Sequence, residues 1–411
     1  MKQPELLAPA GSFEAAETAF LHGANAVYIG IGKLNLRAHS PNFAIEDIPE
    51  LLDMAHKCNG KVYAALNLMP DQSTIPVVRE LLVKLNEKKS IPDAFIISDP
   101  GVLVLCKEIL PSAVLHLSTQ TGTFNLVSLD FWKKQGVARA VLPREFTLSQ
   151  ICEASKANIV ETEIFIHGAM CVSISGRCLL GAYLGERHPN RGDCPQPCRY
   201  RYRLSPVQSE NENTGIWFDA EESDDGVYLL NSKDLCTIDI LPQIIASGVN
   251  SLKIEGRNKS VHYVASVVRV YRAAIDSCLN DSGNYRVLPQ WRKELDALEH
   301  RTYSTGFYNG ELLIQDVFSS KASAKSRVIG TIKAILPGGL PVVDVKNSFG
   351  SGEELEIIPV QQSLEPYPVQ FTKITDLSGN QIERAPSSRL VIGITEKCLR
   401  IGDMIRRTTD A

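Results

Sequence analysis

Long apolar runs are absent from this chain of 411 residues. No stretch of eighteen or more apolar residues occurs, so we expect no membrane-spanning helix. The N-terminal "MKQPELLAPAGS" has no basic region followed by an apolar core, which argues against a secretory signal peptide. These absences predict a cytoplasmic protein without membrane attachment, in which thiols stay reduced and structural disulfides are rare.

A large excess of one charge is also missing. The formal net charge is −4 and hydrophobic residues make up 44% of the chain, which is ordinary globular composition. This balance excludes a strongly basic protein, but it is compatible with a local basic groove that binds nucleic acid.

The common protease signatures H-E-x-x-H and G-x-S-x-G do not occur. Ser173 and Ser175 lie near His167, but no pattern joins them into a nucleophile, base and orienting group. The best residue evidence for a thiol protease is Cys171, which follows His167 by four residues. That pairing leaves three neighbouring cysteines unexplained.

Cysteine, by contrast, is crowded into one segment. "GAMCVSISGRCLLGAYLGERHPNRGDCPQPCRY" holds four of the ten cysteines, spaced Cys171-x6-Cys178-x15-Cys194-x3-Cys198. A disulfide framework is disfavoured in a reduced compartment, and four unrelated core cysteines are disfavoured by the Gly- and Pro-rich sequence around them. Spacing alone favours zinc and an iron–sulfur cluster about equally. Cys236, which we expect at a helix start, is a candidate fifth thiol.

Strands and helices alternate along the first 280 residues. Eight apolar or β-branched strands separated by helices predict an α/β fold, a (β/α)8 TIM-type barrel, with an open doubly wound sheet as the alternative. The expected strands are 4–10, 25–31, 61–67, 93–99, 114–120, 139–146, 161–168 and 251–257.

The pattern along the chain predicts two domains. The barrel spans 1–280 and includes a Cys-rich insertion over 169–233, after the seventh strand. The acidic part of that insertion, 205–230, is interpreted as a surface hairpin or a flap. A linker over 281–324 leads to 325–411, where short alternating strands and turn residues predict a small all-β barrel.

Polar side chains on or just after the strands predict a site at the C-terminal end of the barrel. Arginine and lysine there suit an anionic ligand, since arginine binds a carboxylate with two hydrogen bonds; the alternative is a solvated rim paired with glutamate. The candidate substrate-binding residues are Arg37, Asn67, Gln120, Arg144, Lys253 and Arg257. The candidate acid–base residues are His116, His167, Glu145 and Glu255, although a lone strand histidine is more often a core residue.

Two stretches suit RNA. "CRYRYRL" (198–204) alternates basic side chains for phosphates with aromatic side chains for stacking, and "MIRRT" near the C-terminus is a weaker case. The same alternation is typical of a half-exposed strand.

Several motifs together resemble the collagenase-like peptidase family of unassigned catalytic type. They are "PELLAPAG", "GANAVYIG", "HLSTQTGTFN", "IFIHGAMCVSISGRCLLGAYLGERHPNRGDCPQPCR", "NSKDL" and "SLKIEGRNKS", and the resemblance covers essentially the whole chain. It is strongest to the branch that makes 5-hydroxyuridine at the wobble position of tRNA. The resemblance implies prephenate-dependent hydroxylation, with prephenate or a similar anionic small molecule as the hydroxyl source.

The resemblance also implies a 4Fe–4S cluster, with zinc as the less favoured metal. The four cysteines of the motif, Cys171, Cys178, Cys194 and Cys198, match the ligands of this branch. One relative takes its fourth ligand from further along the chain, but Cys236 is not at an equivalent position. The implied partners are tRNA and an electron donor or iron–sulfur assembly proteins. A collagenase-like peptidase and a non-catalytic RNA-binding protein remain the alternatives.

Overall fold

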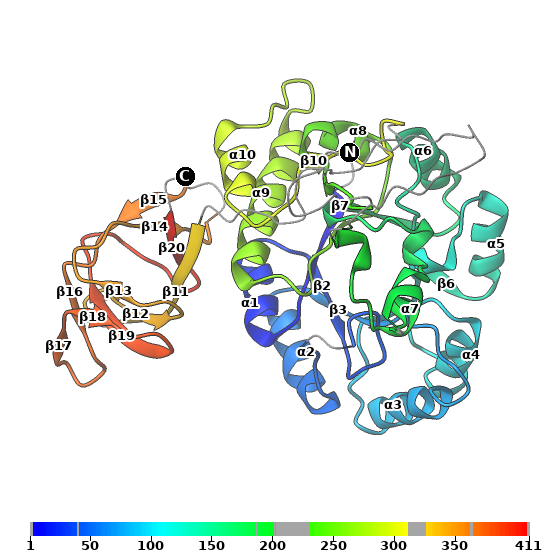
Figure 1. The fold of residues 1–411 in the computed structure, drawn as a ribbon, viewed down its shortest axis with the longest axis horizontal. Coiled ribbons are helices and arrows are strands. Elements are labelled where there is room, and N and C mark those ends of the chain that lie inside the picture. Colours follow the sequence, from blue (N-terminus) through cyan, green and yellow to red (C-terminus); the bar gives the residue numbers. More distant parts are fainter. Residues whose placement is uncertain are drawn as a thin grey trace, which may run out of the picture.

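The first domain is a closed barrel of parallel strands surrounded by helices (Figure 1). Strand β9 (Ser251–Ile254) pairs with β1 (Glu5–Pro9) on one side and with β7 (Glu161–Ala169) on the other, with Lys253 opposite both Leu7 and Phe165, so the sheet closes on itself. This closure confirms the predicted TIM-type barrel and excludes the open sheet. The computed structural model describes residues 3–38, 41–185, 187–200, 202, 230–310, 326–361 and 365–408.

The barrel strands coincide closely with the predicted ones. Each is short and almost fully buried, as expected of parallel strands covered by helices. They are β1 (Glu5–Pro9), β2 (Ala26–Gly30), β3 (Lys61–Leu66), β4 (Ala94–Ile97), β5 (Leu115–Leu117), β6 (Val137–Val141), β7 (Glu161–Ala169) and β9 (Ser251–Ile254).

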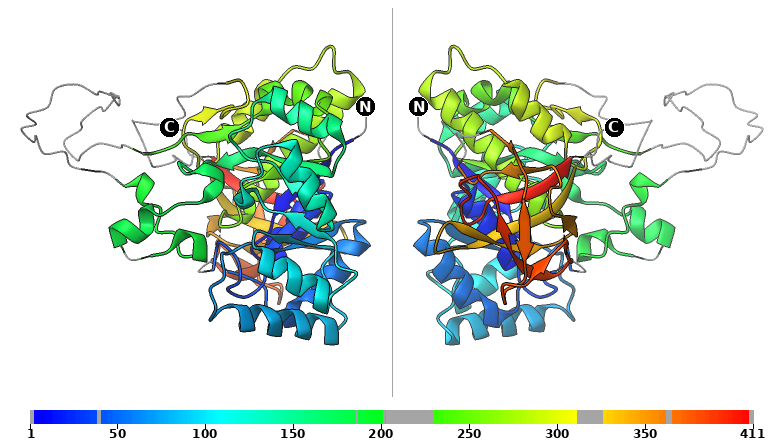
Figure 2. Two further views of the ribbon diagram at one scale, coloured as in Figure 1. Left: turned by 90° about the vertical axis from the view of Figure 1, so that its right-hand side faces the viewer. Right: turned by 90° about the vertical axis from the view of Figure 1, so that its left-hand side faces the viewer.

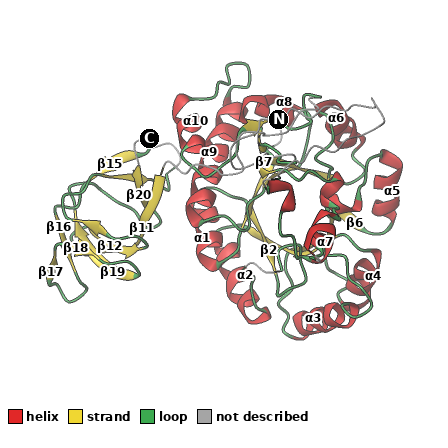
Figure 3. Cartoon of the chain, in the orientation of Figure 1, coloured by secondary structure: helices red, strands yellow, loops and turns green. Residues whose placement is uncertain are grey.

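Helices form a ring outside the strands (Figure 3). Local capping starts several of them: Ser12 accepts a hydrogen bond from the backbone N–H of Ala15, and Thr147 and Gln150 form a reciprocal capping box. The helices of this domain are α1 (Phe13–Leu21), α2 (Ile48–Lys57), α3 (Ile75–Glu87), α4 (Pro100–Ile109), α5 (Leu126–Lys134), α6 (Leu148–Ala157), α7 (Leu180–Gly185), α8 (Leu241–Ala246), α9 (Val261–Asn280) and α10 (Pro289–Asp296).

Two short strands are added to the barrel sheet. Strand β8 (Asp234–Cys236) runs antiparallel to the end of β7, and β10 (Tyr303–Ser304) pairs with β8. The expectation of a helix start at Cys236 is therefore wrong. Strand β7 extends past the barrel rim, and its free backbone groups bind β8 instead.

The Cys-rich segment, here residues 170–200, leaves β7 and crosses the C-terminal end of the barrel. It contains the turn η3 (Ile174–Gly176) and α7, and Figure 2 shows it in green, projecting from the body of the domain. Most of the acidic stretch interpreted as a hairpin or flap lies outside the described residues.

The second domain is an antiparallel β domain, as predicted. Its main sheet has the order β15-β14-β20-β11-β12-β19-β16-β17. It packs on α9 and α10 through the buried Arg406, whose guanidinium binds both carboxylate oxygens of Glu294 at 3.0 and 3.2 Å. The strands are β11 (Ser326–Leu336), β12 (Leu340–Val345), β13 (Phe349–Gly350), β14 (Leu355–Ile358), β15 (Tyr367–Val369), β16 (Lys373–Thr375), β17 (Gln381–Ile382), β18 (Arg384–Ala385), β19 (Arg389–Ile394) and β20 (Met404–Thr408).

The segment expected as a linker, 281–324, holds α10 and β10 in its described part, and both pack on the barrel. Within the described residues, none of the helices is long and apolar enough to cross a membrane.

Candidate functional site

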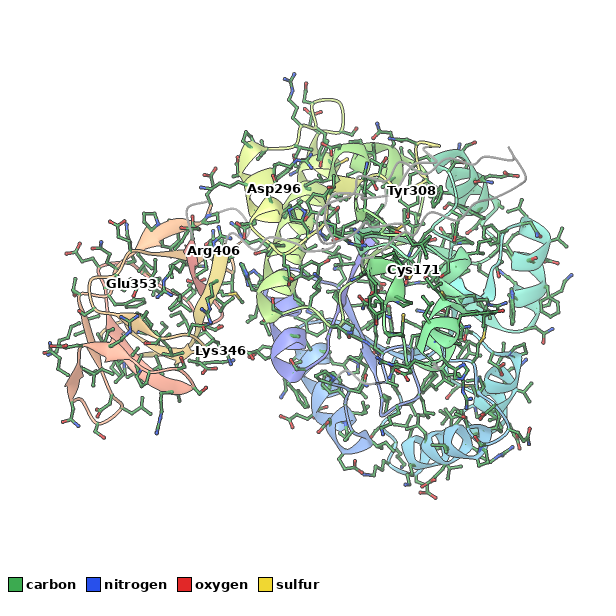
Figure 4. The ribbon with its side chains drawn as sticks, viewed as in Figure 1. Cys171, Asp296, Tyr308, Lys346, Glu353 and Arg406 are labelled. Atoms are coloured by element: carbon green, nitrogen blue, oxygen red, sulfur yellow. The ribbon has the colours of Figure 1, made fainter. Side chains whose placement is uncertain are left out.

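A cavity of about 150 Å³ lies at the C-terminal end of the barrel, between the strand ends and the Cys-rich segment. Figure 4 labels Cys171 in that segment, where it crosses the end of the barrel. All six predicted substrate-binding residues, Glu255 and the four motif cysteines line this cavity. They are Arg37, Asn67, Gln120, Arg144, Cys171, Cys178, Cys194, Cys198, Lys253, Glu255 and Arg257.

Three predicted acid–base residues do not line the cavity. His116 packs edge-on against Tyr63 in the barrel interior, and burial lowers its pKa to about 3. Glu145 lies behind the Cys-rich segment, where one carboxylate oxygen accepts the backbone N–H of Ser175 at 2.6 Å.

His167 is the third residue outside the cavity. Strict alternation along β7 would direct it to the same face as Phe165, but the pairing of β7 with β9 shifts register between these two residues. Its ring instead packs among Tyr263, Tyr271 and Tyr303, and burial lowers its pKa to about 3. No hydrogen bond joins His167 to a cysteine among the described residues, so the structure gives no Cys–His pair for proteolysis.

One wall of the cavity is an ion pair. The Arg37 guanidinium lies 3.1 Å from Glu255, which also accepts a hydrogen bond from the Tyr28 hydroxyl at 3.2 Å. Burial alone would raise the pKa of Glu255, but the arginines Arg37, Arg144 and Arg257 outweigh burial and lower it. Glu255 is therefore an ionised carboxylate that faces the cavity.

Two further cations line the cavity. The Arg144 guanidinium stacks over the Phe165 ring at 3.9 Å and donates to the backbone oxygen of Ala169 at 2.7 Å. The Lys253 ammonium lies 2.9 Å from the fully buried Glu163. Both cations are thus held in place by protein contacts while they line the cavity.

Arg257 is packed more tightly than its sequence suggests. Its guanidinium donates to the Asn35 side chain, while Nη1 has no hydrogen-bond partner among the residues that the structure describes. Burial lowers its pKa to about 10, so it remains cationic at neutral pH. A Cβ at Gly30 would collide with Arg257 and Asn42, so this glycine makes room for the arginine.

The four motif thiols are free and near one another. Burial raises the pKa of both Cys194 and Cys198, and the neighbouring thiol of Cys171 adds to the rise at each. The backbone N–H of Leu180 donates to the Cys178 sulfur at 3.3 Å, and that of Gln196 donates to Cys194. Amide hydrogen bonds of this kind stabilise thiolate ligands in iron–sulfur proteins.

Cys236 is not part of this group. Its sulfur is buried, accepts from the Tyr271 hydroxyl at 3.8 Å and does not line the cavity.

Several polar atoms at the site have no partner in the described part of the chain. They belong to Gln120, whose Nε2 and Oε1 are both unpaired, and to Arg144 Nε, Arg257 Nη1, Glu145 Oε2 and Ser175 Oγ. Buried polar atoms are nearly always hydrogen-bonded in proteins. A group of such atoms around one cavity is typical of a site that binds a polar ligand.

Sequence reasoning missed Ser175 as a site residue, as well as Tyr28 and Arg199. Ser175 has a left-handed backbone with φ of 48°, which no sequence pattern revealed. Arg199 lies in the stretch proposed for RNA and also lines the cavity. Within that stretch Tyr200 is exposed and the Tyr202 hydroxyl donates to Pro197, while Arg201, Arg203 and Leu204 lie outside the described residues.

Fold and site together define a TIM-type barrel protein with a cationic, thiol-lined cavity. The chain belongs to peptidase family U32: the family model matches residues 11–316, and the model of the family's C-terminal domain matches 324–406.

Curated relatives carry two kinds of name. The chain is 34% identical to tRNA hydroxylation protein P1 of Bacillus subtilis, over 93% of this chain and 90% of that protein. It is 33% identical to tRNA hydroxylation protein P of Escherichia coli, over 89% and 88% respectively. It is also 31% identical to a collagenase of Porphyromonas gingivalis, over 75% of this chain and 74% of the relative.

Proposed function

We propose that this protein hydroxylates uridine in tRNA at the cavity described above. The relatives named for tRNA hydroxylation support the reaction class, and they match the chain over nearly its full length. The observation that carries the proposal is the shared cavity, which brings four thiols and five cationic side chains to one end of a barrel. This combination suits redox work on a bound anion better than hydrolysis.

The proposed cofactor is a 4Fe–4S cluster held by Cys171, Cys178, Cys194 and Cys198. When bound, such a cluster supplies one-electron redox chemistry. A single tetrahedral zinc needs its sulfurs about 2.3 Å from one point. Among the described residues, no three His, Cys, Asp or Glu side chains are arranged for a single metal ion. The proposal of a cluster rests on the donor set, four thiols that line one cavity.

The proposed hydroxyl donor is an anionic organic molecule such as prephenate. We propose that its carboxylates bind to Arg144, Lys253 and Arg257, which line the cavity. Among the described residues, no hydrogen-bond partner is found for Arg257 Nη1 or Arg144 Nε. The ion pair with Glu163 fixes the position of the Lys253 ammonium beside the cavity.

The proton and electron balance assigns a role to Glu255. In the donor the C–OH bond breaks and the ring carboxylate leaves as CO2, so that the hydroxyl departs as hydroxide and the ring becomes aromatic. Replacing the C5 hydrogen of uridine by this hydroxide releases one proton and two electrons. Glu255 is ionised and faces the cavity, so we propose it as the acceptor of the proton from C5. An electron-carrier partner takes the two electrons.

The test is complementation of a bacterial host that lacks its own tRNA hydroxylation genes. Mass spectrometry of tRNA nucleosides should detect 5-hydroxyuridine or its derivatives with the wild-type chain and not with Cys194→Ala. Cys58→Ala, an exposed thiol outside the cavity, is the matched control and should retain the product. Absence of the product with the wild-type chain would refute the proposal.

A further inference from the structure

The carboxamide of Gln120 is a buried polar group in the cavity wall. Gln120 is 1% exposed, and neither Nε2 nor Oε1 has a hydrogen bond among the described residues. An unsatisfied buried amide is costly, and the cost is recovered only when a partner arrives. The side chain also lines the cavity, so a ligand can reach it.

Local structure fixes where this carboxamide lies. Gln120 sits in the turn η2 (Thr119–Thr121) after β5, where Ser118 caps the turn and Gly122, with φ of 65°, ends it. On the other side the η3 turn of the Cys-rich segment packs over it, since a Cβ at Gly176 would lie 3.9 Å from Gln120 Cγ. The carboxamide is therefore held between the barrel wall and the Cys-rich segment.

The chemistry of the group restricts its ligand. A carboxamide presents an acceptor and a donor side by side. A carboxylate can only accept, so it would satisfy Nε2 and leave Oε1 facing negative charge. Arg144, Lys253 and Arg257 are better partners for that anion. The ring edge of a pyrimidine base offers a donor next to an acceptor, as N3–H and O4 do in uracil, and satisfies both atoms.

We propose that Gln120 binds the ring edge of the base that is modified, through N3–H and O4 of uracil. The inference rests on the proposed function, because it takes a uridine of tRNA as the substrate. It assigns the cations of the cavity to the donor anion and the Gln120 carboxamide to the base. Enzymes that modify bases extrude the base from its stack and read its edge in this way.

The lining of the cavity suits a flat ring. Ile96, Val141 and Met170 supply apolar lining for the faces of a flat ring. Polar recognition along the edge and apolar contact on the faces are the usual combination for a flipped base.

The test measures binding and does not require turnover. Wild-type protein, Gln120→Leu and the exposed control Gln243→Leu are purified anaerobically. Each is titrated by fluorescence anisotropy against two short anticodon stem-loop RNAs, one with uridine and one with an abasic site at the wobble position. Wild type and Gln243→Leu should prefer the uridine RNA by about tenfold or more. Gln120→Leu should bind both RNAs with the affinity that wild type shows for the abasic one.

A retained uridine preference in Gln120→Leu, or no preference in wild type, would overturn the assignment. So would a loss of prephenate affinity in Gln120→Leu with the uridine preference intact. Thermal unfolding checks the fold. Because no described residue makes a hydrogen bond to the Gln120 carboxamide, Gln120→Leu should keep or raise Tm, and a clear fall would make Gln120 a packing residue. Failure of the proposed function is seen separately, as absence of 5-hydroxyuridine with the wild-type chain.

Discussion

At the scale of residues, the barrel interior contains a buried carboxylate between two cations. Glu163 is fully buried between Lys253 at 2.9 Å and Arg139 at 3.3 Å. Burial alone would raise its pKa, but the two cations outweigh burial and lower it. A lowered folded-state pKa means that this stabilisation is present at neutral pH and is lost as pH falls below the ordinary range of glutamate. Acid should therefore destabilise the part of the barrel interior that contains Glu163 and Lys253.

Replacing Glu163 by leucine should lower the free energy of unfolding by about 3–5 kcal/mol, because it leaves the buried Lys253 ammonium without its carboxylate partner. Urea denaturation measures the change. Glu161→Leu is the matched control: Glu161 lies on the same strand and binds the same Arg139, but its side chain is 48% exposed. The control should change stability by about 1 kcal/mol or less. Equal effects of the two variants would contradict this account of the interior.

Gly30→Ala should impair the site through Arg257. The added methyl group would collide with Arg257 and Asn42, so the guanidinium must move and prephenate affinity should fall about tenfold or more. Isothermal titration calorimetry measures that affinity. Gly283→Ala, whose Cβ would meet only ordinary contacts, should bind the anion like wild type. Unchanged affinity in Gly30→Ala would mean that Arg257 does not contact the anion.

At the scale of elements, the turn η3 stores backbone strain above the cavity. Ser175 and Gly176 are consecutive left-handed residues, with φ of 48° and 74°, and Ser175 is almost fully buried. A left-handed serine costs about 1–2 kcal/mol. Strain of this kind is characteristic of functional sites.

Ser175→Gly should therefore separate stability from activity. Glycine relieves the strain, so the free energy of unfolding should stay level or rise by up to about 1 kcal/mol. Loss of the unpaired hydroxyl should lower 5-hydroxyuridine formation severalfold. Chemical denaturation and nucleoside mass spectrometry provide the two readouts. A destabilised variant with full activity would show that the serine is structural.

The barrel strands and their helices could be predicted from sequence because each strand is a buried apolar run with clear turn signals. Strand β8 could not, since its three residues are held by pairing with the end of β7 and with the distant β10. The cavity residues on strand ends were predicted for the same reason that the strands were. The position of His167 was predicted wrongly. A register shift within β7 breaks the alternation of side chains on which that prediction depends.

At the scale of the whole molecule, a buried ion pair joins the two domains. Arg406 on β20 binds Glu294 on α10, and its Nε also lies 2.6 Å from Glu356 within its own domain. The Ser266 hydroxyl donates to Glu294 at 2.7 Å. No sequence pattern could pair residues that lie so far apart in the chain.

Arg406→Met should weaken the docking of the C-terminal domain, because it leaves Glu294 buried without its cation, at a cost of about 3–5 kcal/mol. Differential scanning calorimetry should then resolve two transitions or a large fall in Tm. Lys346→Met removes a partly exposed pair with Glu14 across the same interface and should change Tm little. If Arg406→Met melts like wild type, the interface does not depend on this pair.

The central claim is that the four thiols hold a redox cluster in the cavity, and the metal content of the native protein tests it most directly. The protein is purified anaerobically and assayed for iron, acid-labile sulfide and zinc, together with an absorption spectrum. The account predicts roughly four iron and four sulfide atoms per chain, lost in Cys194→Ala and kept in Cys58→Ala. Stoichiometric zinc without sulfide in the wild-type protein would contradict it.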